Sequence, residues 1–356
     1  MSSPLGVLIV GGGWVSSQHV AAFKNNPHTE IVGICGVPLC NAQKCATTAG
    51  LDVPCFDNYE QALKMPGVDI VSIGTPQEFH AQQTIDAARA GKHILIEKPV
   101  AQTPSELRAM QEAVHAARVK TVAGFVLRWN PLFQHIKKLS AEGAFGALYR
   151  VETDYQSYQS DWWGGYTTGR TKERGGSAML VAGCHAVDAL RWFAGAGEFE
   201  AAIPVEVFAY SGGKRLGKTE QYNPYTGDWH DGLPLEYPGL EMILVKFSNG
   251  VLGRVCVDFE CIQSYAFPVR IFGDRGTVKD HQILCPQKSK EWQTLTDIGP
   301  ESSDVKHHPF QAEINHLVDC ILTDNESHCN LDDAVLTHNI IFAAQTCYRT
   351  GMPVQL

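Results

Sequence analysis

The chain lacks the surplus of positive charge that is typical of proteins that bind nucleic acid or anionic membranes. Its 356 residues contain 29 Lys and Arg against 38 Asp and Glu, which gives a formal net charge of -9 at pH 7. Phosphate groups attract basic surfaces, so this balance disfavours nucleic acid and membrane partners. A small molecule is the expected partner.

Long apolar runs and secretion signals are also missing. No apolar stretch reaches the roughly 20 residues that cross a bilayer. The amino terminus, MSSPLGVLIVGGG, has no basic segment before its apolar run, and that run leads into glycines rather than into a cleavage site. These absences predict a cytoplasmic protein.

Cysteine is plentiful, but its spacing argues against disulfides and zinc. The 11 cysteines are odd in number and include no Cys-x-x-Cys pair. This pattern is typical of reduced, mostly buried thiols. We therefore expect no metal site.

Strand and helix patterns alternate from Leu5 to about Arg128. Apolar runs typical of buried parallel strands are LGVLIV (5–10), EIVGIC (30–35), VDIVSI (68–73), HILIEK (93–98) and TVAGF (121–125). Helical stretches separate them, and Thr103 followed by Pro104 marks the start of one helix. Residues 1–127 are therefore predicted to form a dinucleotide-binding α/β domain with a doubly wound parallel sheet of the Rossmann type.

The pattern changes after Arg128. A helical segment (131–142), a strand (148–158), a loop rich in glycine and tryptophan, and a helix (185–195) come next. Longer strands then flank the turns 248–250 and 274–276, which predicts antiparallel hairpins. Two helical stretches (308–322 and 331–350) follow. Residues 128–356 are predicted to form a second, α+β domain with a mostly antiparallel sheet.

A glycine turn joins the first predicted strand to the first helix, with the sequence Gly11-Gly12-Gly13-Trp14-Val15-Ser16. Glycines there permit a tight turn and a close approach to a pyrophosphate, whose charge the free N–H groups of the helix start attract. Ser16 stands where a third glycine is usual, and a glycine turn without function is the alternative. Because a second strand follows within about 30 residues, we interpret the turn as a dinucleotide site.

The end of the second strand lacks the acidic residue that would bind the adenosine ribose. The strand ends at Gly36, and Val37 and Pro38 follow. No Arg or Lys stands there to accept a 2′-phosphate either. The expected cofactor is NAD, with NADP left open.

Two further strand ends place polar residues at the carboxyl edge of the predicted sheet, where ligands of doubly wound sheets bind. One leads into a loop with Thr75, Pro76 and His80, and the other ends at Glu97 and Lys98 before a proline, and we expect these five residues to lie at the cofactor. The alternatives are a histidine that caps its own helix and a solvated lysine. Because the proline fixes the backbone directly after it, we interpret Lys98 as a residue that reaches the nicotinamide.

The predicted helix at 185–195 carries a histidine among apolar residues. His185 and Asp188 are three residues apart and lie on one face. Such a histidine is usually a hydrogen-bonded core residue, but together with Lys98 it becomes a candidate catalytic residue.

These segments resemble the glucose-fructose oxidoreductase, inositol dehydrogenase and rhizopine catabolism (Gfo/Idh/MocA) family over the whole chain. The matching stretches are GGGWVSSQH, TPQEFHAQQTIDAARAGKHILIEKPVA, VAGFVLRWNP, RGGSAMLVAGCHAVDALRWFAG and IIFAAQTCYRTGMPV. The resemblance implies a large open mixed sheet in the second domain and homodimers or homotetramers assembled through it. It also implies NAD(P)-dependent oxidoreduction at a secondary hydroxyl of a sugar, cyclitol or glycoside.

The resemblance assigns Lys98 to the lysine of the family's Glu-Lys-Pro and His185 to the histidine of its Gly-x-His-x-x-Asp segment. In that role His185 is the general base, and Lys98 stabilises the developing alkoxide. The family often has an aspartate four residues before the histidine, where this chain has Val181. That departure leaves a third catalytic residue unassigned.

Aromatic and basic residues suited to a sugar ring gather in two places. Arg128 and Trp129 follow the first domain, and the loop before the helix of His185 carries Tyr155, Trp162, Trp163, Tyr166 and Arg174. The alternative is that part of this set packs between the domains.

Three functions remain open. The first is a net NAD-dependent dehydrogenase. The second is an oxidation and elimination enzyme, lyase-like or glycosidase-like, that recycles bound NAD and takes a further acid or base from Tyr155, Asp161 or His230. The third is a sugar-binding regulator without turnover, against which Lys98 and His185 argue.

Overall fold

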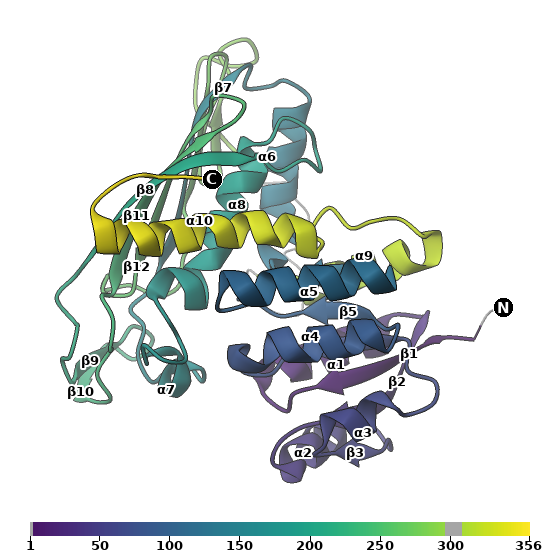
Figure 1. Cartoon of the computed structure of the whole chain (residues 1–356). Helices are drawn as coiled ribbons and strands as arrows, with labels where there is room; N and C mark the ends of the chain where they lie inside the picture. The colour runs from purple at the N-terminus through teal and green to yellow at the C-terminus, as the bar shows by residue number, and fades with distance from the viewer. Residues whose placement is uncertain (1–2, 296–307) are drawn as a thin grey trace. The chain divides into compact units, whose positions relative to one another are not determined.

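The computed structural model of the chain describes residues 3–295 and 308–356 (Figure 1). It divides into two compact units, of which the first comprises Met1–Asn130 with Glu301–Val335 and the second Pro131–Pro300 with Leu336–Leu356. The prediction placed everything from residue 128 onward in the second domain. The structure instead groups the described residues 308–335 with the first unit, because helix α9 packs there.

The first unit contains a parallel sheet of six strands in the order β3-β2-β1-β4-β5-β6 (Figure 1). Their bounds are β1 Leu5–Val10, β2 Thr29–Cys35, β3 Cys55–Phe56, β4 Ile70–Ile73, β5 His93–Ile96 and β6 Thr121–Ala123. The first three strands extend the sheet from β1 toward one edge, and β4 to β6 extend it from β1 toward the other edge. The strand order therefore switches between β1 and β4, as in a doubly wound fold. The predicted Rossmann-type domain is confirmed.

The apolar composition of β1, β4 and β5 matches their position in the interior of the sheet. Residues 7–10, 70–73 and 94–96 are almost completely buried, as parallel strands covered on both faces must be. The two-residue strand β3 was not among the predicted strands, because so short a run leaves no periodic signal.

The helices that connect these strands are α1 (Trp14–Asn25), α2 (Leu39–Ala49), α3 (Tyr59–Leu63), η1 (Gln77–Phe79), α4 (His80–Arg89) and α5 (Pro104–Ala117), and the short helix η2 (Val126–Trp129) follows β6. The predicted start of α5 is confirmed as a capping box. Thr103 Oγ1 accepts from the Glu106 N–H at 3.2 Å, and the Glu106 carboxylate accepts from the Thr103 N–H at 2.9 Å. Such a cap stabilises a helix by about 1 kcal/mol.

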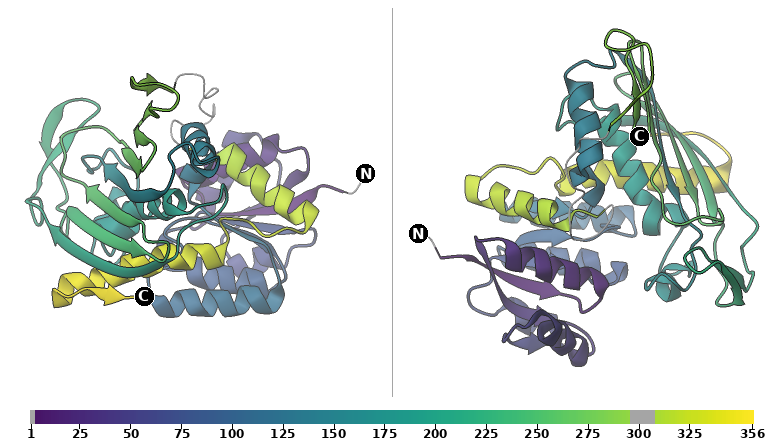
Figure 2. Two further views of the ribbon diagram at one scale, coloured as in Figure 1. Left: turned by 90° about the horizontal axis from the view of Figure 1, so that it is seen from above. Right: turned by 180° about the vertical axis from the view of Figure 1, so that it is seen from behind.

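Helix α9 (Phe310–Thr323) packs against α1 within the first unit (Figure 2). The Phe310 ring meets the His19 ring of α1 edge-on, with 5.5 Å between centroids, and Gln311 Nε2 donates to the Ala22 carbonyl at 3.0 Å. Helical periodicity reveals the apolar face of a helix but not the domain that this face covers. The predicted domain boundary differs for that reason.

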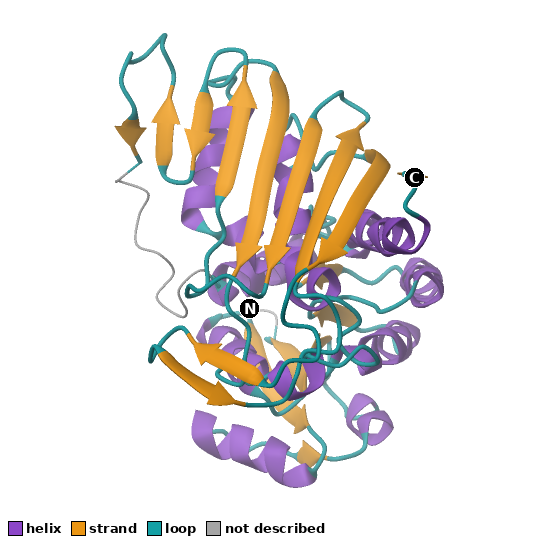
Figure 3. Cartoon of the chain, turned by 90° about the vertical axis from the view of Figure 1, so that its left-hand side faces the viewer, coloured by secondary structure: helices purple, strands orange, loops and turns teal. Residues whose placement is uncertain are grey.

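The second unit is built on a nine-stranded sheet in the order β16-β15-β14-β13-β7-β12-β11-β8-β17 (Figure 3). The bounds are β7 Leu148–Gln156, β8 Pro204–Gly212, β11 Leu240–Phe247, β12 Leu252–Asp258, β13 Val269–Gly273, β14 Thr277–Lys279, β15 Gln282–Leu284, β16 Gln293–Thr294 and β17 Val354–Gln355. Neighbours are antiparallel except β7 and β12, which are parallel. The predicted mostly antiparallel sheet is confirmed.

Both predicted hairpins are present. Ser248-Asn249-Gly250 joins β11 to β12, and Asp274 to Gly276 joins β13 to β14. Gly250 has a φ of 84°, which glycine adopts without strain. A separate hairpin of β9 (Glu220–Asn223) and β10 (Asp228–Asp231) was not predicted.

Helices cover one face of the nine-stranded sheet (Figure 3). They include α6 (Pro131–Ala141), α8 (Cys184–Ala194), which packs on β7 and β12, and the part of α10 (Leu331–Thr350) that follows Val335. A π-helical turn, η3 (Met179–Gly183), leads directly into α8, and a short helix α7 (Tyr166–Gly169) lies in the loop before it. Across residues 3–295 and 308–356, no helix has the length and apolarity to cross a membrane.

Candidate active site

The glycine turn brings the ends of β1 and β4 into close contact. Gly11 has a φ of 122°, and a Cβ there would lie 2.5 Å from the Gly74 carbonyl oxygen. Ser16 is buried, and its hydroxyl donates to the same carbonyl at 3.4 Å. Glycine is therefore required at Gly11, while Ser16 occupies the place of the third glycine and links the two strand ends.

Open space lies in front of Gly13, at the start of α1. A Cβ added to Gly13 would meet nothing within 4 Å, and no side chain caps this helix end. Trp14, the first residue of α1, is 59% exposed and its ring meets Phe310 edge-on at 6.0 Å. An open glycine at an uncapped helix start fits the pyrophosphate of a dinucleotide, which the turn from Gly11 through Val15 to Ser16 would hold.

The end of β2 offers no charged group to the adenosine ribose. Gly36 is buried, and its N–H donates to the Phe56 carbonyl of β3 at 2.8 Å. Val37 follows with 76% of its surface exposed. The local structure thus agrees with the absence of an acidic residue noted in the sequence.

His80 connects two strand ends and is not a solvent-facing cap. It is 1% exposed, and its two ring nitrogens lie 2.8 Å from the carbonyl oxygens of Thr75 and Pro99. Thr75 also donates through Oγ1 to Gln83 at 2.7 Å, and Pro76 precedes the η1 turn. The loop after β4 and the segment after Lys98 are therefore held together by one ring.

Glu97 and Lys98 stand at the carboxyl end of β5, as predicted. The Glu97 carboxylate is buried, with Oε1 3.2 Å from His19 Nε2 and Oε2 accepting from the Lys98 N–H at 3.1 Å. Burial alone would raise the pKa of Glu97, but the contacts with His19 and the charge of Lys98 lower it. An ionised carboxylate thus adjoins the candidate catalytic lysine.

Two buried residues near Glu97 were not identified from the sequence. His19 is 0% exposed, and its Nδ1 lies 2.9 Å from the Ser72 hydroxyl in β4. Glu313 of α9 is also 0% exposed, and burial followed by the nearby charge of Glu97 raises its pKa well above the ordinary range. A lone histidine on the apolar face of α1 was the available signal for His19; α9 gave none for Glu313.

In the second unit, His185 is the second residue of α8 and is 3% exposed. The start of its helical segment is held by Glu241 of β11, whose carboxylate accepts from the Ala178 N–H at 3.0 Å and from the Tyr348 hydroxyl at 2.7 Å. Burial raises the pKa of Glu241 to about 7, although these hydrogen bonds oppose the rise. Sequence reasoning missed Glu241 because it lies in an ordinary alternating strand.

Aromatic rings line the surroundings of His185. Its imidazole meets the Phe267 ring edge-on, with 6.0 Å between the ring centroids. The centroid of the Tyr155 ring lies 5.2 Å from the centroids of both Phe267 and Tyr265. The Tyr155 hydroxyl accepts from Gln159 at 2.9 Å, and burial raises the pKa of Tyr155. The structure thus brings predicted Tyr155 and His185 into one aromatic cluster and adds Tyr265 and Phe267.

Arg128 and Trp129 have structural contacts within the first unit. The fully buried Arg128 guanidinium pairs with Asp333 and donates to the His328 carbonyl at 2.6 Å. Trp129 is buried against the rings of His316 and His328, with centroids 5.5 Å away in each case. These contacts account for both side chains without a substrate.

The remaining predicted substrate residues occupy the loop before η3. Trp162 is half-buried, donates to the Tyr158 carbonyl at 2.7 Å and packs edge-on against Tyr225 at 4.9 Å. Trp163 and Arg174 are half-buried in the same loop. They lie on the same unit as His185, apart in sequence from Arg128 and Trp129.

Two other side chains considered as acids or bases are neighbours. Asp161 Oδ1 lies 2.8 Å from His230 Nε2 of β10, and both side chains remain partly exposed. Val181, in contrast, is buried in η3, and a Cβ on Gly169 would lie 3.2 Å from its methyl group. The position of the family's aspartate is therefore apolar and packed.

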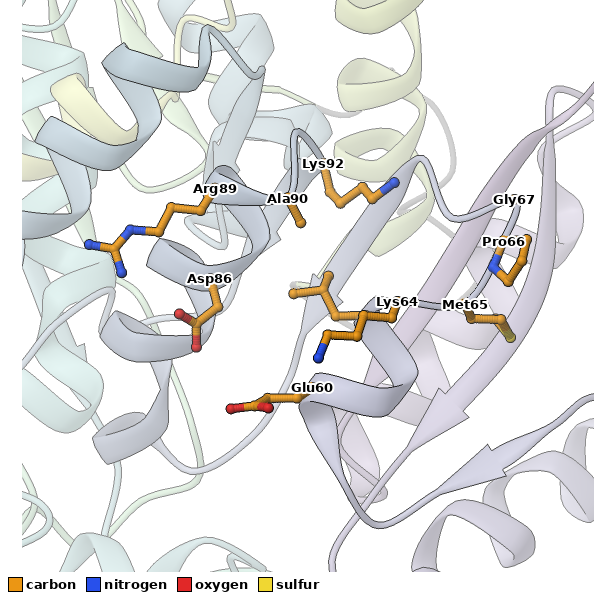
Figure 4. A pocket seen from close by; sticks show the side chains of 10 residues that line it. Glu60, Lys64, Met65, Pro66, Gly67, Asp86, Arg89, Ala90 and Lys92 are labelled. Atoms are coloured by element: carbon orange, nitrogen blue, oxygen red, sulfur yellow. The ribbon is translucent and has the colours of Figure 1, made fainter.

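Among the described residues, no metal cluster marks the site. Within residues 3–295 and 308–356, no three His, Cys, Asp or Glu side chains converge on a metal position. An open hollow of about 530 Å³ lies in the first unit near the amino ends of β4 and β5, away from Lys98 (Figure 4). It is lined by Glu60, Leu63, Lys64, Met65, Pro66, Gly67, Asp86, Arg89, Ala90 and Lys92.

Two family models match the chain in sequence order. Residues 5–125 match the model of an oxidoreductase family with an NAD-binding Rossmann fold. Residues 133–279 match the GFO/IDH/MocA C-terminal domain. Each model thus matches the larger part of one of the two units described above.

Relatives and solved structures agree with these models. The chain is 24% identical to scyllo-inositol 2-dehydrogenase (NAD+) of Bacillus subtilis, over 88% of this chain and 85% of that protein. It is 28% identical to levoglucosan dehydrogenase of Pseudarthrobacter phenanthrenivorans, over 70% of this chain and 66% of that protein. A structure of levoglucosan dehydrogenase with NADH and L-sorbose superposes with a TM-score of 0.83 at 20% identity, covering 99% of each chain.

The glycine turn, the lysine after β5, the histidine of α8 and the two matched models all point to one assignment. The chain belongs to the Gfo/Idh/MocA family of oxidoreductases and has that family's NAD-binding Rossmann domain.

Proposed function

We propose that this protein is an NAD-dependent dehydrogenase of a secondary hydroxyl in a sugar, cyclitol or glycoside, with Lys98 and His185 as catalytic residues. The observation that carries the proposal is the placement of Lys98. Buried contacts of Glu97 and Pro99 fix the backbone on both sides of it, at the same sheet edge as the glycine turn. A lysine held so firmly at a ligand-binding edge has a role beyond solvation.

The residues divide the chemistry between them. Bound NAD supplies the hydride acceptor. As the hydride leaves the substrate carbon, the hydroxyl proton must leave the oxygen, and His185 accepts it. Lys98 donates a hydrogen bond to the same oxygen and stabilises its developing negative charge.

The substrate class rests on relatives and on the aromatic cluster. Relatives carry the names scyllo-inositol 2-dehydrogenase, levoglucosan dehydrogenase and D-glucoside 3-dehydrogenase. Rings such as Tyr155, Tyr265 and Phe267 near His185 suit the apolar face of a pyranose or cyclitol. Titration with NAD and with NADP tests the cofactor preference.

One observation favours a second candidate function. The Asp161–His230 pair, 2.8 Å apart, resembles a carboxylate that orients a histidine for proton transfer. Such a pair would serve an enzyme that oxidises a sugar, eliminates a leaving group and reduces the product again with no net change in cofactor. A glycoside would be its substrate.

A substrate screen separates the two functions. Scyllo-inositol, myo-inositol, levoglucosan and methyl β-D-glucoside are each incubated with the protein and NAD, with NADH followed by absorbance and products by mass spectrometry. A dehydrogenase accumulates NADH and a ketone in equal amounts. Glycoside cleavage without net NADH supports the second function, and no turnover of any compound contradicts the proposed substrate class.

We also propose that two copies of the chain associate through the open face of the nine-stranded sheet. Exposed apolar side chains line this face in register, among them Tyr210, Met242, Leu244 and Leu252. Charged pairs such as Arg254 with Asp154, 3.0 Å apart, lie beside them. A face of mixed apolar and paired charged groups suits a second copy of the same surface.

The thiols support a reducing compartment. All 11 cysteines are free, and most are buried or half-buried. Because disulfides are rare in the cytosol, we propose that the protein works there.

A further inference from the structure

Two buried histidines flank the segment that carries Lys98, and the chemistry proposed above uses neither. His19 belongs to α1 and His80 to α4, the helices that follow β1 and β4. They are 0% and 1% exposed. Each contacts a residue directly adjacent to Lys98 in sequence.

His80 acts on the carboxyl side of Lys98. Its Nδ1 lies 2.8 Å from the Pro99 carbonyl oxygen, and its Nε2 lies 2.8 Å from the Thr75 carbonyl oxygen. A neutral imidazole donates one hydrogen bond, and a protonated ring donates two. Burial lowers the pKa of His80, the two carbonyls and Glu97 oppose that shift, and Lys98 adds to it.

His19 acts on the amino side of Lys98. Its Nδ1 lies 2.9 Å from the Ser72 hydroxyl, and its Nε2 lies 3.2 Å from Glu97 Oε1. Glu97 in turn accepts from the Lys98 N–H through Oε2. The Gly124 backbone lies beside this carboxylate, since a Cβ added to Gly124 would come within 3.2 Å of Oε1.

We propose that His19 and His80 are positioning residues that hold the backbone of Lys98 from both sides. His80 acts through the Pro99 carbonyl, and His19 acts through the Glu97 carboxylate. Because both neighbours are fixed, the Lys98 backbone has a single position. Its side chain then loses less conformational entropy when the ammonium contacts the reacting oxygen. This inference rests on the proposed role of Lys98 in the reaction.

Amide variants separate the two nitrogens of each ring. The side-chain amide of Asn replaces the Nδ1 donor of a histidine, and that of Gln replaces the Nε2 donor. His80→Asn therefore keeps a donor beside the Pro99 carbonyl, while His19→Gln keeps a polar amide near Glu97 Oε1, which lies 3.2 Å from His19 Nε2. We expect these two variants to retain most of kcat, and His80→Gln and His19→Asn to lose about tenfold, as for a lost buried hydrogen bond.

The measurements are kcat and KM on whichever screened compound is turned over, and the Kd of NAD by fluorescence titration. His80→Ala lowers kcat about tenfold or more, with the Kd of NAD unchanged. His115→Ala is the control, because this histidine lies in the same unit with its side chain 59% exposed. Equal kcat for His80→Asn and His80→Gln, or wild-type kcat for His80→Ala, would overturn the proposal.

A double-variant cycle distinguishes failure of this inference from failure of the proposed function. If His80 acts through Lys98, adding His80→Ala to Lys98→Ala lowers kcat no further than Lys98→Ala alone. Full additivity would overturn the positioning role. Wild-type turnover of Lys98→Ala would instead reject the catalytic role of Lys98.

A labelling experiment needs no substrate. Acetic anhydride is applied to the folded wild type and to His80→Ala, His80→Asn and His80→Gln, and the modification of Lys98 is measured by mass spectrometry relative to exposed Lys44. We expect His80→Ala and His80→Gln to change the rate of Lys98 acetylation about tenfold. His80→Asn should leave this rate near that of the wild type. Identical rates in all four proteins would contradict the proposal.

Discussion

At the scale of single residues, Glu241 joins three elements of the second unit. Its carboxylate accepts hydrogen bonds from Ala178, at the start of the segment that leads to His185, and from Tyr348 of α10. It is 1% exposed, and Tyr237 and Tyr166 also lie in this buried region. Burial of the carboxylate raises its pKa to about 7, although its hydrogen bonds with Tyr348 and Ala178 oppose the rise.

This shift predicts a pH-dependent stability. The folded-state pKa of about 7 exceeds the ordinary 4.5, so the folded protein holds the proton more tightly than the unfolded chain does. The contribution of Glu241 is complete below pH 4.5 and is lost as pH rises through about 7. Relative to Glu241→Gln, the wild type should lose at most about 3 kcal/mol of unfolding free energy between pH 4.5 and 8.

Urea unfolding at several pH values measures this difference. Glu112→Gln is the matched control, since Glu112 is exposed on α5 and should leave the pH profile of the wild type unchanged. Parallel pH profiles for the wild type and Glu241→Gln would show that the carboxylate does not hold its proton at neutral pH.

Arg128 shows what a residue type alone leaves undetermined. The sequence identifies a basic residue beside a tryptophan, which suits a sugar, but not its partner Asp333, which lies 205 residues away in the chain. Lys98 can be predicted more readily, because the apolar strand before it and the proline after it lie within a few residues of it in the sequence. Glu313 and Glu241 could not be identified, since only tertiary packing buries them.

At the scale of elements, the structure of the glycine turn predicts how a negative charge at Gly13 changes the Kd of NAD. Gly13 has a φ of -88° and open space in front of it, so Gly13→Asp should fold and can cap α1. Its carboxylate would face the pyrophosphate and raise the Kd of NAD about tenfold or more by repulsion.

Isothermal titration with NAD tests this expectation, and Gly13→Ala controls for the added carbon. A folded Gly13→Asp protein with wild-type affinity for NAD would place the cofactor elsewhere.

The end of β2 predicts weak discrimination between the two cofactors. Neither an acid nor a cation follows Gly36, and exposed Val37 occupies the expected position. NAD should bind more tightly than NADP, by no more than about tenfold, or 1.4 kcal/mol. Titration of both cofactors tests this, and a strong preference for NADP would reveal an Arg or Lys that reaches the site from another element.

Local sequence patterns predict the helices, strands and turns better than they predict which distant segments pack together. The capping box at Thr103, the Rossmann strands and the two hairpins follow from spacing of a few residues. The parallel pairing of β7 with β12 and the packing of α9 on α1 join distant segments, for which single-sequence periodicity holds no information. The π-helical turn before His185 likewise had no signal in its apolar run.

At the scale of the whole molecule, the open sheet face predicts an effect on assembly. Leu244 is 56% exposed in the middle of β11, among the other apolar side chains of that face. Leu244→Glu should place a charge inside the proposed interface and shift the protein toward monomers. Sedimentation velocity measures the mass, and Leu322→Glu on α9, 47% exposed, is the control. A monomeric wild type, or an unchanged mass for Leu244→Glu, would argue against this interface.

The central claim is that Lys98 and His185 act on one reacting oxygen, and their single variants test it most directly. On a compound from the screen, Lys98→Ala and His185→Ala should each lower kcat by roughly 10²–10⁴-fold while the Kd of NAD stays unchanged. Lys98→Arg should restore little, because a planar guanidinium does not replace an ammonium. If His185→Ala alone kept its turnover, Tyr155, Asp161 and His230 would be the next bases to test. Near wild-type kcat in both alanine variants would contradict the account.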